Sequence, residues 1–328
     1  MIKIGTIGTG KIVEEFIKAA LKNPNLEIAC CYSRKKDKAQ SIIRKYKLYA
    51  RAVDSFNVMI DEVDAVYIAT PNGLHFEQAK YFIQLQKHVL LEKPLTLEYN
   101  QALELSELAI MNNVILMEAY KTIHLPQFAI LFEYSNNINP FLATFNLKQY
   151  SSRMENVKKG IYDSVFDEKL GKGSTYDMLI YPVELAISLF GPVKEVKAMG
   201  LKLPNGSGLN DCVLLRHENE AIVNIVCSKA SAGTIKNEIS SDMATIIFDD
   251  CISLKNISVL SHQNMNKNTV YEENAPLEVN LFDYELAVFS KMILNNDYKL
   301  RDYLLNISCE AIKVLNVIER NQDERGVI

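Results

Sequence analysis

The sequence predicts an α/β chain in which a doubly wound parallel sheet is followed by an α+β region with an open, largely antiparallel sheet. Up to about residue 120, short apolar runs alternate with amphipathic helical patterns. Continuous apolar runs are typical of parallel strands that are buried on both faces. Beyond residue 120 the runs alternate apolar and polar residues, as in 141–150, which is typical of antiparallel strands with one exposed face. We therefore expect two domains, 1–121 and 122–328.

The expected elements follow from these patterns in chain order. The chain opens with an apolar run, IKIGTI, and a helical stripe of apolar residues begins at Ile12. Later strands of the first domain are expected at 27–33, 64–71, 88–94 and 114–120, and helices at 35–46, 75–86 and 97–113. Strands of the second domain are expected at 141–150, 193–201, 211–217, 220–228, 244–248 and 251–259. The polar stretch 261–276 is expected to be a loop, and helices are expected near 281–294 and 301–320.

The composition argues against several classes of protein. Of the 328 residues, 48% are hydrophobic and 23% are charged, which is ordinary for a globular protein. The net charge of −4 gives no indication of nucleic acid or of an anionic membrane as a partner. No apolar run approaches the roughly 18 residues of a membrane span, and we see no signal peptide. The six cysteines form no C-x-x-C pair, so we expect a cytoplasmic protein with reduced cysteines and no metal.

A glycine-rich turn joins the first strand to the first helix. In GTGKIV, glycines would let the backbone approach a pyrophosphate, whose charge the helix N-terminus stabilises. Val13 stands where the third glycine of G-x-G-x-x-G is expected, but that glycine serves helix–strand packing. Alone the turn is weak evidence, because a βα turn that binds nothing can have this composition. Its place in the first βα unit favours a dinucleotide site that includes Gly8, Thr9, Gly10, Lys11 and Ile12.

The end of the second strand indicates which dinucleotide is bound. An NAD site usually carries Asp or Glu here, hydrogen-bonded to the ribose 2′-hydroxyl. This chain has CYSRKKDK, in which Ser33 can donate to a phosphate oxygen and Arg34 can pair with a phosphate. The alternative is a solvated basic helix start, but basic charge at a helix N-terminus is unfavourable without an anion. We therefore expect NADP as the cofactor, with NAD possible.

Two later motifs carry groups that can transfer a proton. In LEKP, Lys93 follows a buried strand at the carboxyl edge where ligands bind in such sheets, with Glu92 beside it. The alternative is an ordinary surface lysine. Asp177 and Tyr181 are four positions apart, so a helix would place them on one face. The alternative there is a tyrosine that packs in the core. Because a nearby cation lowers the pKa of a phenol, these residues can form a proton-transfer set with the lysine.

Together these motifs resemble the glucose–fructose oxidoreductase / inositol dehydrogenase / rhizopine-catabolism (Gfo/Idh/MocA) oxidoreductases. IGTGKI resembles the cofactor turn of that family, KHVLLEKPL its most specific signature, and MEAYKTIHLPQF the segment that leaves its nucleotide domain. DAVYIATPNGLHFEQA resembles its fourth-strand segment. The resemblance implies a Rossmann domain, then an α/β domain whose open sheet forms a homodimer or higher homo-oligomer. It adds these residues to the predicted cofactor site: Thr70, Pro71, Asn72, His75, Glu92 and Lys93.

The segment around Tyr181 refines the resemblance. Many members carry histidine there, whereas Tyr181 followed by Pro182 resembles the branch of glucose–fructose oxidoreductase and the dimeric dihydrodiol dehydrogenases, which prefers NADP. Leu179 replaces a glycine that is common in that branch, and Lys121 and Thr122 replace its aromatic and arginine pattern. These departures leave the substrate open.

The resemblance implies hydride transfer between nicotinamide and a secondary alcohol or ketone of a sugar, cyclitol or dihydrodiol. Lys93 is then the catalytic lysine and assists Tyr181, the general acid or base. Asp177 would orient Lys93 or bind a substrate hydroxyl. Two alternatives stay open, a non-catalytic NAD(P)-binding redox sensor and an NAD-dependent polyol dehydrogenase.

Overall fold

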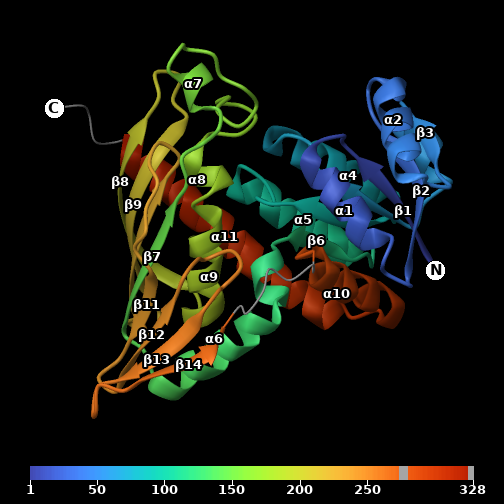
Figure 1. Ribbon diagram of the computed structural model, residues 1–328. Coiled ribbons are helices and arrows are strands. Elements are labelled where there is room, and N and C mark those ends of the chain that lie inside the picture. The colour runs from blue at the N-terminus through green and yellow to red at the C-terminus, as the bar shows by residue number, and fades with distance from the viewer. Residues whose placement is uncertain (273–279, 324–328) are drawn as a thin grey trace. The chain divides into compact units, whose positions relative to one another are not determined.

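The computed structural model describes residues 1–272 and 280–323 (Figure 1). The chain forms two compact units. The first contains Met1–Lys121 together with a later segment that ends at Cys309, and the second contains the rest. Within the described ranges, no helix is both long enough and apolar enough to cross a membrane.

The first unit is built on a parallel sheet. Its described strands are β1 (Ile2–Ile7), β2 (Leu26–Tyr32), β3 (Arg51–Val53), β4 (Ala65–Ile68), β5 (His88–Glu92) and β6 (Leu116–Ala119). They lie in the order β3-β2-β1-β4-β5-β6, and every pairing is parallel. This is the strand order of a Rossmann sheet. The predicted doubly wound parallel sheet is therefore confirmed.

Helices connect these strands. They are α1 (Lys11–Ala20), α2 (Lys36–Tyr46), α3 (Phe56–Ile60), the 3₁₀ turn η1 (Asn72–Leu74), α4 (His75–Gln84) and α5 (Tyr99–Met111). The helix α1 shows why the predicted stripe forms a helix, because Val13, Phe16, Ile17 and Ala20 are all buried. Such spacing places apolar side chains on one helical face.

The expected division of the chain needs one amendment. The boundary after residue 121 is the one expected, but α10 (Phe282–Asn295) and the start of α11 (Tyr298–Asp323) belong with the first unit. The reason is aromatic packing and hydrogen bonding from a side chain to the backbone across a long sequence separation. The Phe282 ring lies edge-on to Phe16 and to Tyr67, and the Arg301 guanidinium donates to the carbonyl oxygens of Ala109 and Val114.

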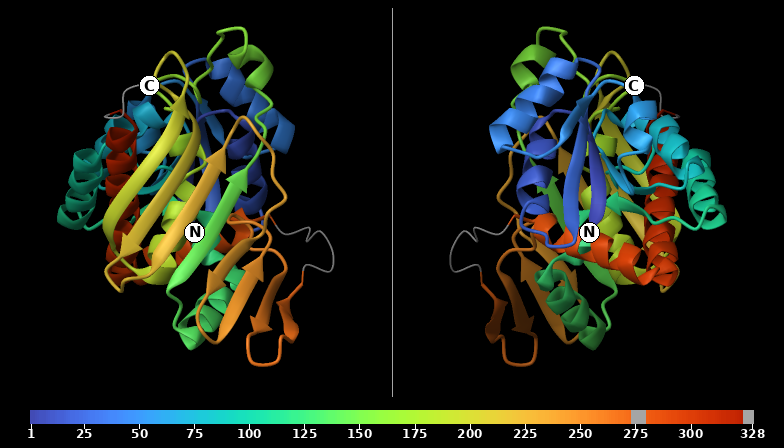
Figure 2. Two further views of the ribbon diagram at one scale, coloured as in Figure 1. Left: turned by 90° about the vertical axis from the view of Figure 1, so that its left-hand side faces the viewer. Right: turned by 90° about the vertical axis from the view of Figure 1, so that its right-hand side faces the viewer.

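The second unit contains a broad sheet, which the left view of Figure 2 faces. Its described strands are β7 (Leu142–Lys148), β8 (Val193–Lys202), β9 (Gly208–His217), β10 (Ile222–Ser228), β11 (Asn237–Ser240), β12 (Ala244–Phe248), β13 (Ile257–Ser261) and β14 (Lys267–Tyr271). They lie in the order β14-β13-β12-β11-β7-β10-β9-β8. Only the described pair β7 and β10 is parallel, so the prediction of a largely antiparallel sheet is confirmed.

Helices of the second unit pack against one face of this sheet (Figure 2). They are α6 (Pro126–Ile138), α8 (Ser174–Asp177) and α9 (Ile180–Phe190), and the short α7 (Met154–Val157) follows β7 in the chain. On α9, every residue from Pro182 to Phe190 is buried. A helix that is buried all round contributes to the hydrophobic core on each of its faces.

Two predictions in this unit are wrong. The expected strand at 251–259 begins only at Ile257, because the Asp250 side chain accepts hydrogen bonds from the backbone N–H groups of Ile252 and Ser253 and so holds a turn. The expected loop at 261–276 contains β14, and its residues 273–276 lie outside the described ranges. Polar residues form this strand because it lies at the edge of the sheet and is largely exposed.

Candidate active site

The predicted cofactor residues of the first unit gather at one edge of its sheet. In the strand register, Ile7 pairs with Tyr32 and with Ile68, and Ile68 pairs with Leu91. Parallel strands therefore end side by side, directly before the segments that contain the predicted residues. These segments are 8–12, 33–34, 70–75 and 92–93. Ligands bind at such carboxyl edges in open α/β sheets.

The glycine turn has two glycines with different surroundings. Gly8 has a φ of +123°, and a Cβ there would lie 2.6 Å from the Ala69 carbonyl oxygen. Gly10 has an ordinary φ of −81°, and a Cβ there would meet no protein atom within 4 Å. Neither backbone conformation nor protein packing therefore explains why residue 10 is glycine. Val13 is fully buried behind the turn, which shows that helix α1 accommodates a valine in place of the third glycine.

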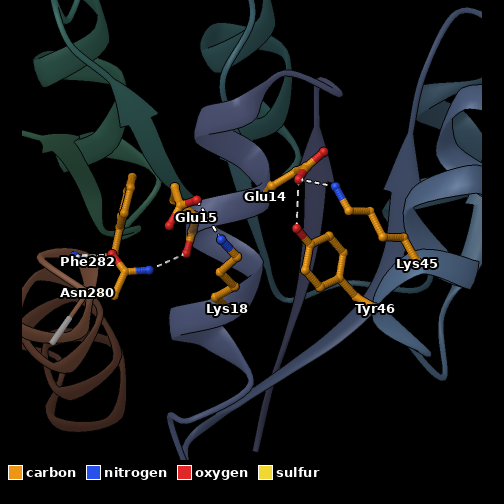
Figure 3. A network of polar contacts seen from close by, with 7 residues as sticks. All are labelled: Glu14, Glu15, Lys18, Lys45, Tyr46, Asn280 and Phe282. Atoms are coloured by element: carbon orange, nitrogen blue, oxygen red, sulfur yellow. Dashed lines mark hydrogen bonds and ion pairs between the residues drawn. The ribbon is translucent and has the colours of Figure 1, made fainter. Parts of the chain in front are cut away.

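Helix α1, which begins at this turn, is fixed on two sides (Figure 3). On one side, Glu14 accepts hydrogen bonds from Lys45 at 2.5 Å and from the Tyr46 hydroxyl at 2.7 Å. These two hydrogen bonds hold the pKa of Glu14 below its ordinary value. On the other side, the Asn280 amide donates to the Glu15 carbonyl oxygen at 2.6 Å. The helix N-terminus is therefore held in a fixed place at the sheet edge.

Basic residues follow the second strand, as the sequence indicates. Ser33 is partly exposed, and Arg34, Lys35 and Lys36 are exposed. The Ser33 hydroxyl accepts a hydrogen bond from the Lys35 backbone N–H at 3.3 Å, which shapes the turn into α2. The carboxylate nearest to this strand end in sequence is Asp37, in the first turn of α2. The exposed Arg34, Lys35 and Lys36 side chains could therefore pair with an anion such as a 2′-phosphate.

The turn after β4 is tied to the loop after β5 by a buried histidine. His75 is fully buried, and its ring nitrogens lie 2.9 Å from the Pro94 carbonyl oxygen and 3.0 Å from the Thr70 carbonyl oxygen. Burial lowers the pKa of His75. These contacts give the side chain a role in holding the two loops. Its predicted contact with the cofactor stays a prediction, as do those of Thr70, Pro71 and Asn72.

Lys93 lies in a loop that is anchored before and after it. Before it, Glu92 accepts a hydrogen bond from the Tyr67 hydroxyl at 2.6 Å. Burial raises the pKa of Glu92, although that hydrogen bond and the charge of Lys93 oppose the shift. After it, the Lys93–Pro94 peptide bond is cis, and the Leu95 backbone N–H donates to Glu118 at 2.6 Å. The backbone at Lys93 is therefore held at the carboxyl edge of β5.

A third carboxyl group lies close to Glu92 and was not predicted from the sequence. Glu285 of α10 is fully buried, and neither of its carboxyl oxygens has a hydrogen-bond partner among the described residues. Burial, with the nearby charges of Glu92 and Glu118, raises the pKa of Glu285 well above its ordinary value. Only the packing of α10 against the first unit brings this residue to the loop.

In the second unit, Asp177 and Tyr181 lie on different helices, so the expected single helical face is wrong. Helix α8 ends at Asp177, and α9 begins at Ile180. Pro182 explains the break, because it lacks a backbone N–H and is tolerated only in the first turn of a helix. Both side chains are partly exposed.

The segment that leads to Asp177 is anchored along its length. Gly173 has a φ of +78°, and a Cβ there would overlap the Gly208 carbonyl oxygen. The Ser174 and Thr175 hydroxyls donate to the buried Asp211 carboxylate at 2.6 and 2.8 Å. The Tyr176 hydroxyl donates to Glu319 at 2.7 Å. Every residue before Asp177 in this short helix is therefore fixed to a neighbouring element.

Asp177 has a charged partner that was not predicted from the sequence. The Lys229 ammonium forms an ion pair with the Asp177 carboxylate, and the Lys229 side chain is only 6% exposed. The signal was present in IVCSKAS, where a lysine directly follows a buried strand, as Lys93 does. Among the described residues, no group of three or more His, Cys, Asp or Glu side chains could hold a metal ion.

Two family models match the chain. One, described as "Oxidoreductase family, NAD-binding Rossmann fold", matches residues 2–120, and a GFO/IDH/MocA C-terminal domain model matches residues 146–247. The scyllo-inositol 2-dehydrogenase (NADP(+)) IolU of Bacillus subtilis is 30% identical over 331 residues, with 100% of this chain and 98% of that protein covered. The chain belongs to the Gfo/Idh/MocA family of oxidoreductases. The family resemblance seen in the sequence is thereby confirmed.

Two further proteins are similar to this chain over nearly its whole length. The uncharacterized oxidoreductase YgjR of Escherichia coli is 28% identical, with 100% of this chain and 98% of that protein covered. The crystal structure of KijD10, a 3-ketoreductase from Actinomadura kijaniata in complex with NADP and TDP-benzene, matches with a TM-score of 0.85. That match covers 98% of each chain at 18% sequence identity, so it shows a shared fold.

Proposed function

We propose that the chain is an NADP-dependent oxidoreductase that acts on a secondary alcohol or ketone of a sugar or cyclitol. The observation that carries the cofactor assignment is Gly10, where the fold leaves space for a Cβ and the sequence supplies none. A pyrophosphate at the N-terminus of α1 accounts for that glycine. Ser33 and Arg34 would hold the 2′-phosphate. The names of two relatives, IolU and the NADP complex of KijD10, support the same cofactor.

The bound nicotinamide supplies the hydride acceptor or donor. The residues of the chain supply geometry and charge. We assign Tyr181 as the general acid that protonates the carbonyl oxygen during reduction, and as the base in the reverse direction. Lys93 stabilises negative charge on that oxygen. Asp177 accepts a hydrogen bond from the substrate. Lys93 belongs to the first unit and Tyr181 to the second, so their joint action stays a prediction.

The substrate class follows from the relatives and from the polar groups of the site. IolU is named as a scyllo-inositol dehydrogenase and KijD10 as a 3-ketoreductase. A hydroxyl-rich substrate needs hydrogen-bonding groups, which Asp177 and Tyr181 provide. The same groups would serve an inositol, a free sugar or a nucleotide-linked sugar.

A turnover screen tests this proposal. Purified protein is incubated with NADP⁺ or NAD⁺ and a panel of inositols, aldoses and sugar alcohols, and reduced cofactor is followed by absorbance at about pH 8 to 9, which favours oxidation because that direction releases a proton. We expect turnover with at least one polyol and a higher kcat/KM with NADP⁺. NADPH binding without turnover on any member of this panel, or on the matching ketoses and keto-inositols with NADPH or NADH, would contradict the proposal and favour a redox sensor.

A further inference from the structure

Lys229 is a charged residue in an apolar place. It directly follows strand β10, and its ammonium lies 5.8 Å from the centre of the Phe166 ring. Phe166 is fully buried and forms an apolar cluster with Met154 and Val157. The Lys229 backbone is held on both sides, because its N–H donates to Leu209 and its carbonyl oxygen accepts from Ser151. A lysine is rarely buried in this way unless its charge is paired.

The charge of Lys229 is paired with Asp177, which is 30% exposed. Removing an ammonium from water is unfavourable unless an anion compensates it, and the same holds for the carboxylate. The Cys227 thiol on β10 and the Asp211 carboxyl on β9 lie on the strands beside this pair, and burial raises the pKa of each. The charge of Lys202 on β8 opposes the shift of Asp211. Lys229 is the cation that forms the ion pair with Asp177.

We propose that Lys229 is a positioning residue that keeps Asp177 ionised and oriented, so that Asp177 accepts a hydrogen bond from a substrate hydroxyl. This inference rests on the proposed function. It concerns one of the two roles that the sequence left open for Asp177, the binding of a substrate hydroxyl, for which the ion pair with Lys229 would hold the carboxylate in place. A carboxylate has about four lone-pair sites, so an ion pair at one oxygen leaves capacity to accept from a substrate.

Activity measurements on two variants test the positioning role. Lys229→Met removes the charge and keeps an unbranched apolar side chain, whereas Lys229→Arg keeps the charge. For Lys229→Met we expect kcat/KM for the best substrate to fall about tenfold or more, the range of a hydrogen bond to a charged group. The acid limb of its pH profile should move to higher pH, since loss of a nearby cation makes a carboxylate easier to protonate. Lys229→Arg should recover most of both, and the NADPH Kd should stay near wild type.

Lys80→Met is the matched control. Lys80 also pairs with a carboxylate, that of Glu104, and also lies over an aromatic ring, that of Phe76, but on the α4–α5 surface of the first unit. We expect wild-type kcat/KM and pH profile for this variant. An unchanged pH profile in Lys229→Met, or no recovery in a folded Lys229→Arg, overturns the inference.

A double-mutant cycle of Lys229→Met with Asp177→Asn distinguishes a role of the ion pair in stability from a role in the reaction. If Lys229 acts through Asp177, Lys229→Met should change kcat/KM less than about twofold in the Asp177→Asn background. In urea unfolding, the unfolding equilibrium constant of the double variant should differ about fivefold or more from the value that the two single variants predict without coupling. If the two substitutions are coupled in unfolding but have additive effects on kcat/KM, the pair has a structural role only and the inference is overturned. If they are coupled in neither measurement, the inference is also overturned. A wild type that turns over no substrate defeats the proposed function instead, and the unfolding cycle still decides whether the pair exists.

Discussion

Gly8 lies so close to Ala69 that a Cβ on the glycine would be 2.6 Å from the alanine carbonyl oxygen, and its φ of +123° is one that side chains rarely allow. Two residues later, a Cβ on Gly10 would meet no protein atom within 4 Å. The fold therefore requires the first glycine, and we propose that a bound dinucleotide accounts for the second.

Substitutions at the two glycines should separate these requirements. We expect Gly8→Ala to lower the free energy of unfolding by about 2 kcal/mol or more, through the clash and the backbone conformation. Gly10→Val should lower it by no more than about 1 kcal/mol, the scale of a helix cap. Gly10→Val should nevertheless raise the NADPH Kd at least about tenfold, or 1.4 kcal/mol. Urea unfolding and fluorescence titration measure these effects, and unchanged affinity of Gly10→Val for both dinucleotides would remove the cofactor assignment.

Arg34 should determine the preference for NADP. Arg34→Ala would remove the proposed charge-assisted hydrogen bond to the 2′-phosphate, so we expect the KM for NADPH to rise about tenfold or more while the KM for NADH changes little. Arg44→Ala, which changes an exposed arginine on the helix α2 that follows Arg34, is the control and should leave both values near wild type. A wild-type protein with a higher kcat/KM for NADH would contradict this prediction.

Glu285 should make the stability of the protein depend on pH. Because its pKa is raised in the native state, the native protein keeps a proton that the unfolded chain releases above about pH 4.3. The free energy of unfolding contributed by this group therefore falls as pH rises from that value. We expect Glu285→Gln to stabilise the protein by about 1 kcal/mol or more at pH 8, and by less at pH 5.

Urea unfolding at the two pH values measures the effect of Glu285→Gln. The control is Glu107→Gln, an exposed glutamate on α5, for which we expect little change at either pH. A destabilised Glu285→Gln variant at pH 8 would show that the carboxylate has a favourable partner in the native protein.

Gly173 should set the position of the segment that contains Asp177. Gly173→Ala adds both an unfavourable φ and an overlap with Gly208, so we expect a loss of about 2 to 4 kcal/mol in the free energy of unfolding. Gly160→Ala is the control, because Gly160 has a similar φ of +72° with no atom near the added Cβ. It should lose only about 1 kcal/mol. Equal losses for the two variants would show that the close approach of Gly173 to Gly208 has no energetic importance.

The sequence was most informative where local pattern and local structure coincide. One βα unit contains the run IKIGTI, the glycines after it and the apolar stripe from Val13 to Ala20. The spacing of apolar residues along the sequence is enough to predict this unit. The same holds for LEKP, because a buried strand with polar residues at its end places those residues at the sheet edge.

Predictions failed where side chains act over a distance or where one residue overrides a pattern. Nothing in the sequence near Phe282 indicates that it packs on Phe16, and so the place of α10 could not be predicted. Pro182 starts a new helix and separates Asp177 from Tyr181, although their spacing suits one helix. Lys229 and Asp177 are far apart in sequence, and only the packing of α8 against β10 brings them together.

Tyr181 and Lys93 are proposed to serve one proton-transfer step. The most direct measurement is kcat for Tyr181→Phe with the best substrate of the screen, alongside the NADPH Kd and the pH profile of kcat/KM. We expect a fall in kcat of about 10² to 10⁴-fold, the usual contribution of general acid–base catalysis, with the Kd near wild type and one limb of the profile lost. Lys93→Met should be at least as damaging, and the double variant should be far from additive. A Tyr181→Phe variant that keeps most of its activity and its pH profile would show that Tyr181 is not the proton donor.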